Sequence, residues 1–456
     1  MRKLVLFFLL LGSTLGWAQT NENVLSLETY LEWVQRNHPL VKAVENKIPT
    51  AKAELVRARG AFDPTLAGNY ASKEFKGDLY YRLPSWSLEQ NLRGPISVGV
   101  DWNATAGLYT NPQDKLPEEG MFAIGGMVEL GNGLFTDASR TTLRLAKAGV
   151  DMSEAEAQLY KNELLLKATK SYWKWYAAHE NLKSYEKAIE AAQEVYDFAL
   201  NAFEAGDASA MDTLDAHALL TTWQTDYFQA RNKALAALYD ASTWLWSSAE
   251  EPMVLNPEVT PSNDIPTYSI PLNWDENHPL IRYNDAKEKQ LRAKRALARE
   301  YIKPKVAVGG ALLVPGNLEA LPSTSEFDEN NRVLKAKIDM PIFVREGIGY
   351  ARSQNLQLET FEFERAGAEY ALKLEWASMV LRIAELDKAV QASLGNQNTL
   401  QALLDGEKEK FELGDSELIK VNLRTSYYAK AMIQRANLQA ELGMAWATWA
   451  NLAAAL

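Results

Sequence analysis

Two aspartates, Asp212 and Asp215, have the spacing that most suggests a charged site. Their separation of three positions would place both carboxylates on one face of a helix. Such a pair could attract cations near an opening. It could equally be an N-terminal carboxylate pair that the helix dipole favours. The spacing alone leaves both interpretations open.

Catalytic and metal-binding chemistry has little material in this chain. The 456 residues include no cysteine and four histidines, which excludes disulfides and thiolate sites. No glycine-rich phosphate loop, zinc motif or Ser/His/Asp arrangement stands out, and no carboxylate pair has a pocket-like context. We therefore predict no enzyme, no cofactor and no metal site. An exported hydrolase on a helical scaffold is the alternative, and it would need a clustered polar site.

Charge and the first residues point to export. The chain carries 48 basic and 59 acidic side chains, a formal charge of −11, which argues against nucleic-acid binding. Residues 1–18 combine a positive start, an apolar run and small residues at a cleavage site, as signal peptides do. The apolar run is too short to span a bilayer, and no later run is long enough. We expect the mature protein to leave the cytoplasm.

The chain contains two versions of one unit. The Asn-His-Pro-Leu sequence at 37–40 recurs at 277–280, an offset of 240 residues. The offset falls to 212 and then to 208 further along, so most of the length difference lies between positions 64 and 140. We expect structural roles for the residues that define the repeat, which are Pro39 with Pro279, Pro64 with Pro304, and Arg140 with Arg352.

Each repeat is predicted to contain opening helices, then strands, then a long helical hairpin. The repeats cover 19–249 and 272–456, and the five prolines of 250–271 indicate an extended linker. The first prolines of each repeat suit helix starts, and the second pair ends the opening helices. The predicted ranges are helices 25–62, strands 64–131 and hairpin 136–247, and then helices 272–303, strands 304–343 and hairpin 349–456.

The long hairpins are the clearest prediction. Between Val150 and Glu251 there is no proline, and Gly206 is the only glycine. Good helix formers dominate, so one helix of about 100 Å can run from about 136 to 203. The turns fall at Gly206 and Asp207 in the first repeat, and at Gly414 and Asp415 in the second. Ser209 or Asp212 could cap the returning helix.

The predicted strands fit either a membrane barrel or a soluble sheet. Residues 334–340 alternate between apolar and charged side chains, as a strand with one apolar face does. In the first repeat, strand candidates are 65–75, 96–108 and 121–130, in a region rich in tyrosine and tryptophan. These aromatics would lie at the interfaces of a membrane barrel or in the core of a soluble sheet. The strand pattern does not decide between the two.

The combination resembles the TolC-like outer-membrane efflux family, the outer membrane factors. The motifs that carry the resemblance are the repeated Asn-His-Pro-Leu, the prolines at 64 and 304, the Pro-Ile-Phe at 341–343 and the hairpin-tip sequences that begin at Gly206 and Gly414. Their order and duplication extend the resemblance over nearly the whole mature chain.

The resemblance implies a fold, a location and partners. It implies a mostly helical homotrimer in the lipid of the cell outer membrane, with a twelve-helix periplasmic tunnel and a twelve-strand β-barrel to which each chain gives four strands. The function would be passive conduction in a tripartite efflux or type I secretion system. An inner-membrane pump would supply the energy, and a periplasmic membrane-fusion adaptor would dock at Gly206, Asp207, Gly414 and Asp415.

Two further implications concern the entrance and the alternative function. In a trimer, Asp212 and Asp215 could form acidic rings that narrow the periplasmic entrance. The function that competes with a duct is that of a soluble periplasmic coiled-coil adaptor or structural protein. Adaptors usually have one long hairpin with flanking β domains, whereas this chain has two long hairpins, one in each of its two similar halves. Similar ducts carry drugs, metal ions, metabolites and polypeptides, so the resemblance does not name the cargo.

Overall fold

The computed structural model describes residues 16–17, 24–111, 115–117, 119–270, 273–318 and 327–456. All of the predicted signal segment except residues 16 and 17 lies outside these ranges. The chain forms two compact units. The first consists of Met1–Asn46, Glu156–Ile281 and Glu369–Leu456, and the second of Lys47–Ala155 and Arg282–Ala368.

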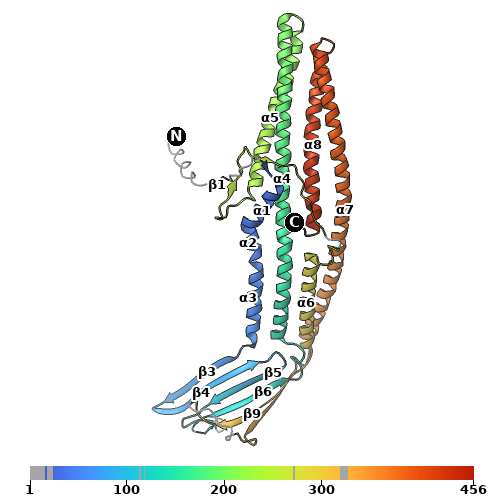
Figure 1. Ribbon diagram of the computed structural model, residues 1–456. Coiled ribbons are helices and arrows are strands. Elements are labelled where there is room, and N and C mark those ends of the chain that lie inside the picture. The colour runs from blue at the N-terminus through green and yellow to red at the C-terminus, as the bar shows by residue number, and fades with distance from the viewer. Residues whose placement is uncertain (1–15, 18–23, 112–114, 118, 271–272, 319–326) are drawn as a thin grey trace. The chain divides into compact units, whose positions relative to one another are not determined.

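One antiparallel sheet lies in the second unit. Among the described residues it has six strands, in the order β10-β9-β6-β5-β4-β3 (Figure 1). The resemblance implied four strands from each chain, and the structure corrects this number to six. The strands are β3 (Thr65–Phe75), β4 (Asp78–Asn91), β5 (Ile96–Asn103), β6 (Met121–Glu129), β9 (Lys305–Pro315) and β10 (Arg332–Asp339).

The two additional strands, β4 and β5, account for the unequal length of the repeats. β3 and β9 each have 11 residues and begin directly after the repeated prolines. β10 pairs directly with β9, whereas β4 and β5 lie between β3 and β6. The offset between the repeats falls by 240 − 212 = 28 residues across this region. The two strands with their turn, 78–103, span 103 − 78 + 1 = 26 residues. The first repeat is therefore the second repeat with a β-hairpin inserted.

Four helical segments follow one another in the second unit. α3 (Lys47–Arg59) packs through Ala58 on Leu143 in the first part of α4 (Ala138–Ala205). The same part of α4 lies beside α6 (Pro279–Glu300), where the ammonium Nζ of Lys289 is 3.8 Å from the Asp151 carboxylate. α6 in turn pairs with the first part of α7 (Arg345–Glu412). The order is therefore α3, α4, α6, α7.

The first unit contains the two long hairpins. The remainder of α4 returns as α5 (Ala210–Ser242), and the remainder of α7 returns as α8 (Leu418–Leu452). It also holds α1 (Leu27–Asn37), α2 (Pro39–Glu45) and four two-residue strands. Of these, β1 (Gly16–Trp17) pairs with β7 (Met253–Val254), and β2 (Val24–Leu25) pairs with β8 (Thr260–Pro261).

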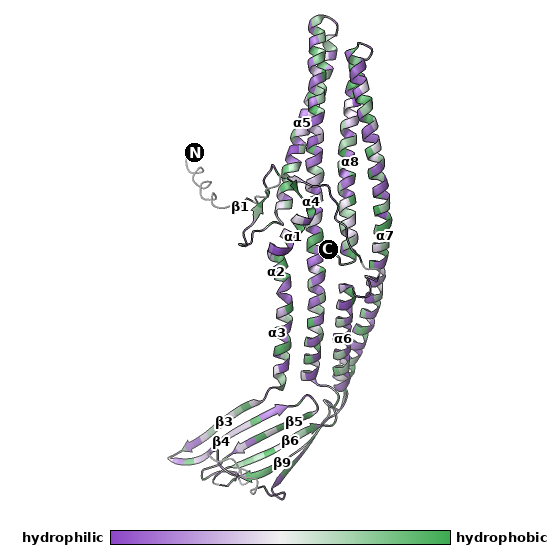
Figure 2. Ribbon diagram, in the orientation of Figure 1, coloured by the Kyte–Doolittle hydropathy of each residue, from purple (hydrophilic) through white to green (hydrophobic). Residues whose placement is uncertain are grey.

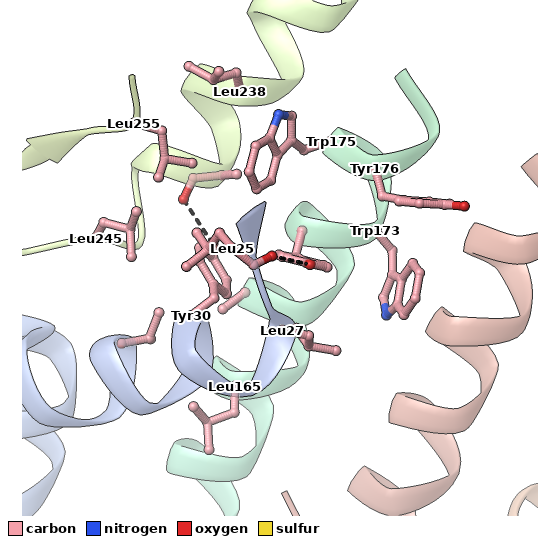
Figure 3. Packing of buried hydrophobic residues seen from close by; sticks show 14 of the residues in the cluster. Leu25, Leu27, Tyr30, Leu165, Trp173, Trp175, Tyr176, Leu238, Leu245 and Leu255 are labelled. Atoms are coloured by element: carbon pink, nitrogen blue, oxygen red, sulfur yellow. Dashed lines mark hydrogen bonds between the residues drawn. The ribbon is translucent and has the colours of Figure 1, made fainter. Parts of the chain in front are cut away.

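The core of the first unit gathers large aromatic residues (Figure 3). Trp173 and Trp175 of α4 are fully buried, as expected for packing residues. The hydroxyl of Tyr30 donates a hydrogen bond of 2.8 Å to the carbonyl oxygen of Ala241, which ties α1 to the end of α5. The predicted linker contributes Leu255 to this core, so part of the linker is packed against the helices of the first unit.

The repeated Asn-His-Pro-Leu motif is a helix N-cap. His38 precedes α2, and its Nδ1 accepts a 3.2 Å hydrogen bond from the backbone N–H of Leu40. His278 precedes α6 and accepts a 3.1 Å bond from the N–H of Leu280 in the same way. Proline at the next position loses no helical hydrogen bond. The two histidines therefore have the same structural role, as caps of the helices that begin at the repeated prolines.

Candidate functional site

The tips of the two hairpins have the same backbone geometry. Gly206 and Gly414 take φ angles of 85° and 80°, in the left-handed region that glycine adopts without strain. The N–H of Asp207 donates a 2.8 Å bond five residues back, to Ala202. The N–H of Asp415 does the same in the second tip, also at 2.8 Å. Both helices thus end in a Schellman turn at the predicted positions.

Asp212 is committed to a capping box at the start of α5. The carboxylate of Asp212 accepts bonds from the backbone N–H and the hydroxyl of Ser209, at 3.0 and 2.8 Å. The hydroxyl oxygen of Ser209 in turn accepts from the N–H of Asp212. The bonds from Ser209 lower the pKa of Asp212. Asp215 lies one turn later with an exposed side chain. The two carboxylates that the spacing suggested as a pair therefore differ: that of Asp212 is hydrogen-bonded in the cap, and that of Asp215 is exposed.

The second tip has a different polar network. Glu417 is the N-cap of α8 and makes no side-chain capping bond. Instead the hydroxyl of Ser416 donates to the carboxylate of Glu407 near the end of α7. This bond is the largest influence that lowers the pKa of Glu407.

The charges of the two tips also differ. The 43 residues between Lys187 and Arg231 include eight acidic residues and no lysine or arginine. The second tip mixes both signs, with Lys408, Lys410 and Lys420 among its carboxylates. The first tip is therefore the acidic one.

Near their tips the two hairpins pack on each other. The rings of Phe198 in α4 and Phe411 in α7 lie 4.5 Å apart between centroids. The ammonium of Lys408 is 2.6 Å from the carboxylate of Glu194, and Val421 of α8 is fully buried in the shared cluster. The contacts of this shared cluster therefore hold the residues of both tips in place.

The six-stranded sheet has two chemically different faces. Side chains on alternate positions share a face, and the strand register carries each face across the sheet. One face, here called the apolar face, consists mainly of large hydrophobic residues. Figure 2 colours the strands by hydropathy, and hydrophobic and hydrophilic colours both occur along them. Its members include Leu66, Tyr70, Trp86, Leu88, Ile96, Val98, Val100, Trp102, Phe122, Ile124, Val128, Val306, Val308, Leu312, Val314, Leu334, Ala336 and Ile338.

The opposite face, here called the polar face, carries mostly polar or small side chains. Its polar members include Thr65, Asn69, Ser87, Glu89, Asp101, Glu129, Lys335 and Lys337, and its small members include Ala67, Gly99, Ala123, Gly125, Ala307, Gly309 and Ala311. A hollow of about 180 Å³ lies on this face, with Asp101 and Lys335 among its lining residues.

Much of the apolar face is exposed in the single chain. Leu334 and Ile338 are 75% and 76% exposed, and Tyr70 is 68% exposed. The aromatic residues Trp86, Trp102 and Phe122 are register partners on successive strands, so they form one row across the sheet. A soluble sheet would cover such a face with other elements. The structure therefore favours the membrane alternative that the strand pattern left open.

The repeated arginines have different surroundings. Arg140 is buried, and its guanidinium donates to the carbonyl oxygens of Gly133 and Leu134 and to the Asp137 carboxylate, the last at 2.7 Å. It fixes the loop that leads from β6 into α4. Arg352 has an exposed side chain on α7 and lines a shallow groove between α6 and α7.

Two kinds of site are not found in the described part of the chain. No group of three or more His, Asp or Glu side chains there could hold a metal ion. No helix among the same residues is both long and apolar enough to cross a membrane.

Comparisons with known proteins identify the architecture. A family model described as outer membrane efflux protein matches residues 100–240. Among solved structures, the CmeC outer membrane channel of Campylobacter jejuni aligns with a TM-score of 0.67 at 14% identity, over 95% of this chain and 86% of that chain. VceC of Vibrio cholerae aligns at 0.66 and 11% identity, over 94% and 96%. The resemblance to the outer-membrane efflux family is confirmed.

A third solved structure agrees. The open state of the MtrE outer membrane channel of Neisseria gonorrhoeae aligns with a TM-score of 0.62 at 17% identity, over 92% of this chain and 88% of that chain. No curated protein matches the chain significantly in sequence. The predicted fold class, mostly helical with a duplicated hairpin unit and a sheet, is confirmed by these likenesses. The family model that matches residues 100–240 describes an outer membrane protein, in agreement with the predicted location.

One surface of α7 was not predicted. Leu356, Phe363 and Tyr370 recur at seven-residue spacing. Leu374 follows four residues after Tyr370, and Leu381 a further seven residues on, so the two leucines continue the stripe in a heptad pattern. All five are at least half exposed. A heptad stripe is the seam of a coiled coil and requires a partner helix. The spacing was visible in the sequence, but its exposure was not.

Proposed function

We propose that this chain is one protomer of a homotrimeric outer-membrane exit duct. The observation that carries the proposal is the sheet with one exposed apolar face and one polar face, built from the same chain as two long helical hairpins. The apolar face suits lipid, and the polar face suits a water-filled lumen. A soluble periplasmic adaptor, the alternative function, would have no use for an exposed apolar face of this extent.

The unpaired edges of the second unit support assembly from several copies. The outer strands β3 and β10 each have one edge without a partner strand among the described residues. Open edges are not tolerated in lipid, because their backbone groups would lack hydrogen bonds. The exposed heptad stripe of α7 also requires a neighbour. In a ring of three copies, the open strand edges and the exposed stripe of α7 would each contact a neighbouring copy.

The hairpin tips are the proposed docking surface for a periplasmic adaptor. Gly206, Asp207, Gly414 and Asp415 lie at the turns and are exposed. The duct itself would be passive, with energy supplied by an inner-membrane pump. This arrangement corresponds to a tripartite efflux or type I secretion system.

The entrance role of the aspartates is proposed mainly for Asp215. The carboxylate of Asp212 is occupied by the capping box, whereas the exposed Asp215 is free to face a pore. If so, Asp215→Asn lowers cation preference of the purified duct in planar bilayers. Asp212→Asn is the matched control, and it destabilises the start of α5 instead.

Charge reversal at the tips tests the function. Asp207→Lys together with Asp415→Lys leaves both glycine turns intact, because neither aspartate caps a helix. We expect export by the reconstituted system to fall while the amount of outer-membrane trimer stays unchanged. The exposed Asp387 of α7 offers the control reversal, Asp387→Lys, and it should leave export unchanged. Unchanged export in the tip variant would remove the docking proposal.

A further inference from the structure

The structure assigns the outer segment of the proposed duct eighteen strands, six from each of three copies. This inference rests on the proposed trimer and adds to it the size of the outer opening. Three features of the second unit support it: the inserted hairpin of β4 and β5, the direction of the two edge strands, and the match in circumference between the strands and the helices.

The inserted hairpin is an integral part of the sheet. β4 pairs with β3 on one side and with β5 on the other, in continuous register: Leu88 lies opposite Leu66 in β3 and opposite Val100 in β5. β5 then pairs with β6, where Val100 lies opposite Ile124. A hairpin folded outside a barrel would leave β3 and β6 as neighbours. Here β4 and β5 separate them completely.

The hairpin also carries the same division into faces as its neighbours. Trp86 and Leu88 of β4 lie on the apolar face, whereas Ser87 and Glu89 lie on the polar face. In β5 the apolar positions continue with Val100, and Asp101 lies on the polar side. On a face that is exposed in the single chain, as Trp86 and Leu88 are, this alternation fits strands with lipid on one side and water on the other. The inserted strands therefore belong to the membrane wall.

The edge strands have the direction that closure requires. All neighbours in the sheet are antiparallel, and the sheet has an even number of strands, so β3 and β10 run in opposite directions. β10 of one copy can therefore pair antiparallel with β3 of the next copy. The occupant of each free edge is thus a second copy of this chain, and three copies contribute 3 × 6 = 18 strands.

The circumference of such a barrel matches that of the helices. At a strand spacing of about 4.8 Å and a tilt of about 40°, each strand takes about 6.3 Å of the wall, so eighteen strands make about 113 Å. Four helical segments per copy, α3, α4, α6 and α7, give twelve in three copies. At about 9.5 Å between axes they make about 114 Å. Twelve strands would make only about 75 Å.

The consequence is a wide outer opening. The backbone diameter is about 36 Å for eighteen strands and about 24 Å for twelve. Allowing about 5 Å for side chains on each wall leaves a clear bore of about 26 Å against about 14 Å. Small residues on the polar face, such as Ala123, Gly125, Ala307 and Gly309, keep this lumen open. The outer segment therefore accepts bulky cargo, including structured peptides.

Cryo-electron microscopy of the full-length protein in lipid nanodiscs counts the strands directly. We expect eighteen strands in a threefold particle. A threefold particle with twelve strands would overturn the inference and leave the proposed function standing. A particle without threefold symmetry would overturn the proposed trimer itself.

Labelling of a single cysteine with maleimide reagents of different size measures the clear bore of the outer segment. The chain has no cysteine, so Ala307→Cys places a single thiol on the polar face near the helical end of the sheet. Maleimide polymers of about 20 Å diameter, a size between the two clear bores, should label it from outside. Val308→Cys, on the apolar face, is the matched control and should not react with them. Labelling of Ala307→Cys by a small maleimide but not by the polymer would overturn the inference.

A deletion equalises the two repeats. Removing residues 76–103, which number 103 − 76 + 1 = 28 like the change in offset across the strand region, joins β3 to the loop before β6. In this background we expect the polymer to be excluded and the small reagent to react. If the deletion variant does not assemble, the polymer result on the full-length protein still decides.

Discussion

The assignment of lipid to the apolar face can be tested with two adjacent residues of β6. Ile124 lies on the apolar face, between Val100 and Leu312 in the neighbouring strands. Ala123 lies on the polar face, opposite Asp101. We expect Ile124→Lys to prevent assembly in the outer membrane and Ala123→Lys to be tolerated, because the new ammonium then faces water and a carboxylate.

The magnitude follows from the position of Ile124 near the middle of its strand. A lysine on the lipid face of a barrel costs about 2–4 kcal/mol near the bilayer midplane. Since about 1.4 kcal/mol is a factor of ten, the ratio of folded to unfolded chain falls about 30- to 1,000-fold. Each trimer contains three such substitutions. Loss of assembled protein should therefore be nearly complete.

The assay is the amount of trimer recovered from purified outer membranes, measured by gel electrophoresis without heating. Both variants gain one positive charge in the same strand, so each controls for the other. Equal recovery of Ile124→Lys and wild type would refute the assignment of lipid to this face. Equal loss in both variants would show that the strand tolerates no lysine, and would refute the division of the sheet into two faces.

Other predictions concern stability and packing. Burial lowers the pKa of His38 and of His278 below the ordinary value of 6.5, so the unfolded chain binds more protons as the pH falls below about 6.5. Thermal stability should therefore fall from pH 7 to pH 5, and less steeply in the non-titrating cap variants His38→Asn and His278→Asn. A Cβ at Gly443 of α8 would overlap the indole of Trp173, so Gly443→Leu should destabilise by about 1–3 kcal/mol in denaturant unfolding. Trp173→Leu in the same chain should recover part of that loss. Ser209→Ala should cost about 1 kcal/mol through the lost cap, measured in the same way.

Much of the fold was readable from local signals. A repeated proline at the first helical position, with histidine before it, indicated helix starts, and both histidines are N-caps in the structure. Gly206 and Gly414 indicated helix reversals because glycine readily takes the positive φ of a Schellman turn. Ser209, one of two residues considered as the cap of the returning helix, is the N-cap. These features depend on a few neighbouring residues, which is why sequence reasoning reached them.

The features that sequence reasoning missed depend on distant contacts. β4 was not among the strand candidates. Pro84 lies inside it and argues against a central strand. The 28-residue drift between repeats carried the signal for an inserted hairpin, but only the pairing with β3 and β5 gives it a place. Likewise, the spacing of Asp212 and Asp215 could not show that Ser209 occupies one carboxylate and leaves the other exposed.

The heptad stripe of α7 illustrates the same limit. Phe363 is 72% exposed, which no sequence pattern can establish, because burial depends on which helices lie beside it. We expect Phe363→Asp to weaken the association of copies without unfolding the chain. Native mass measurements in detergent and far-ultraviolet circular dichroism separate the two effects. Trimers of undiminished stability would show that this stripe does not form the seam between copies.

The mass of the particle and the cell fraction that contains it decide whether the protein is a trimeric exit duct. We expect detergent to extract the protein from the outer membrane as a particle of three chains, each of about 51.0 kDa before processing. Recovery from the soluble periplasm as a single chain would contradict the exit duct.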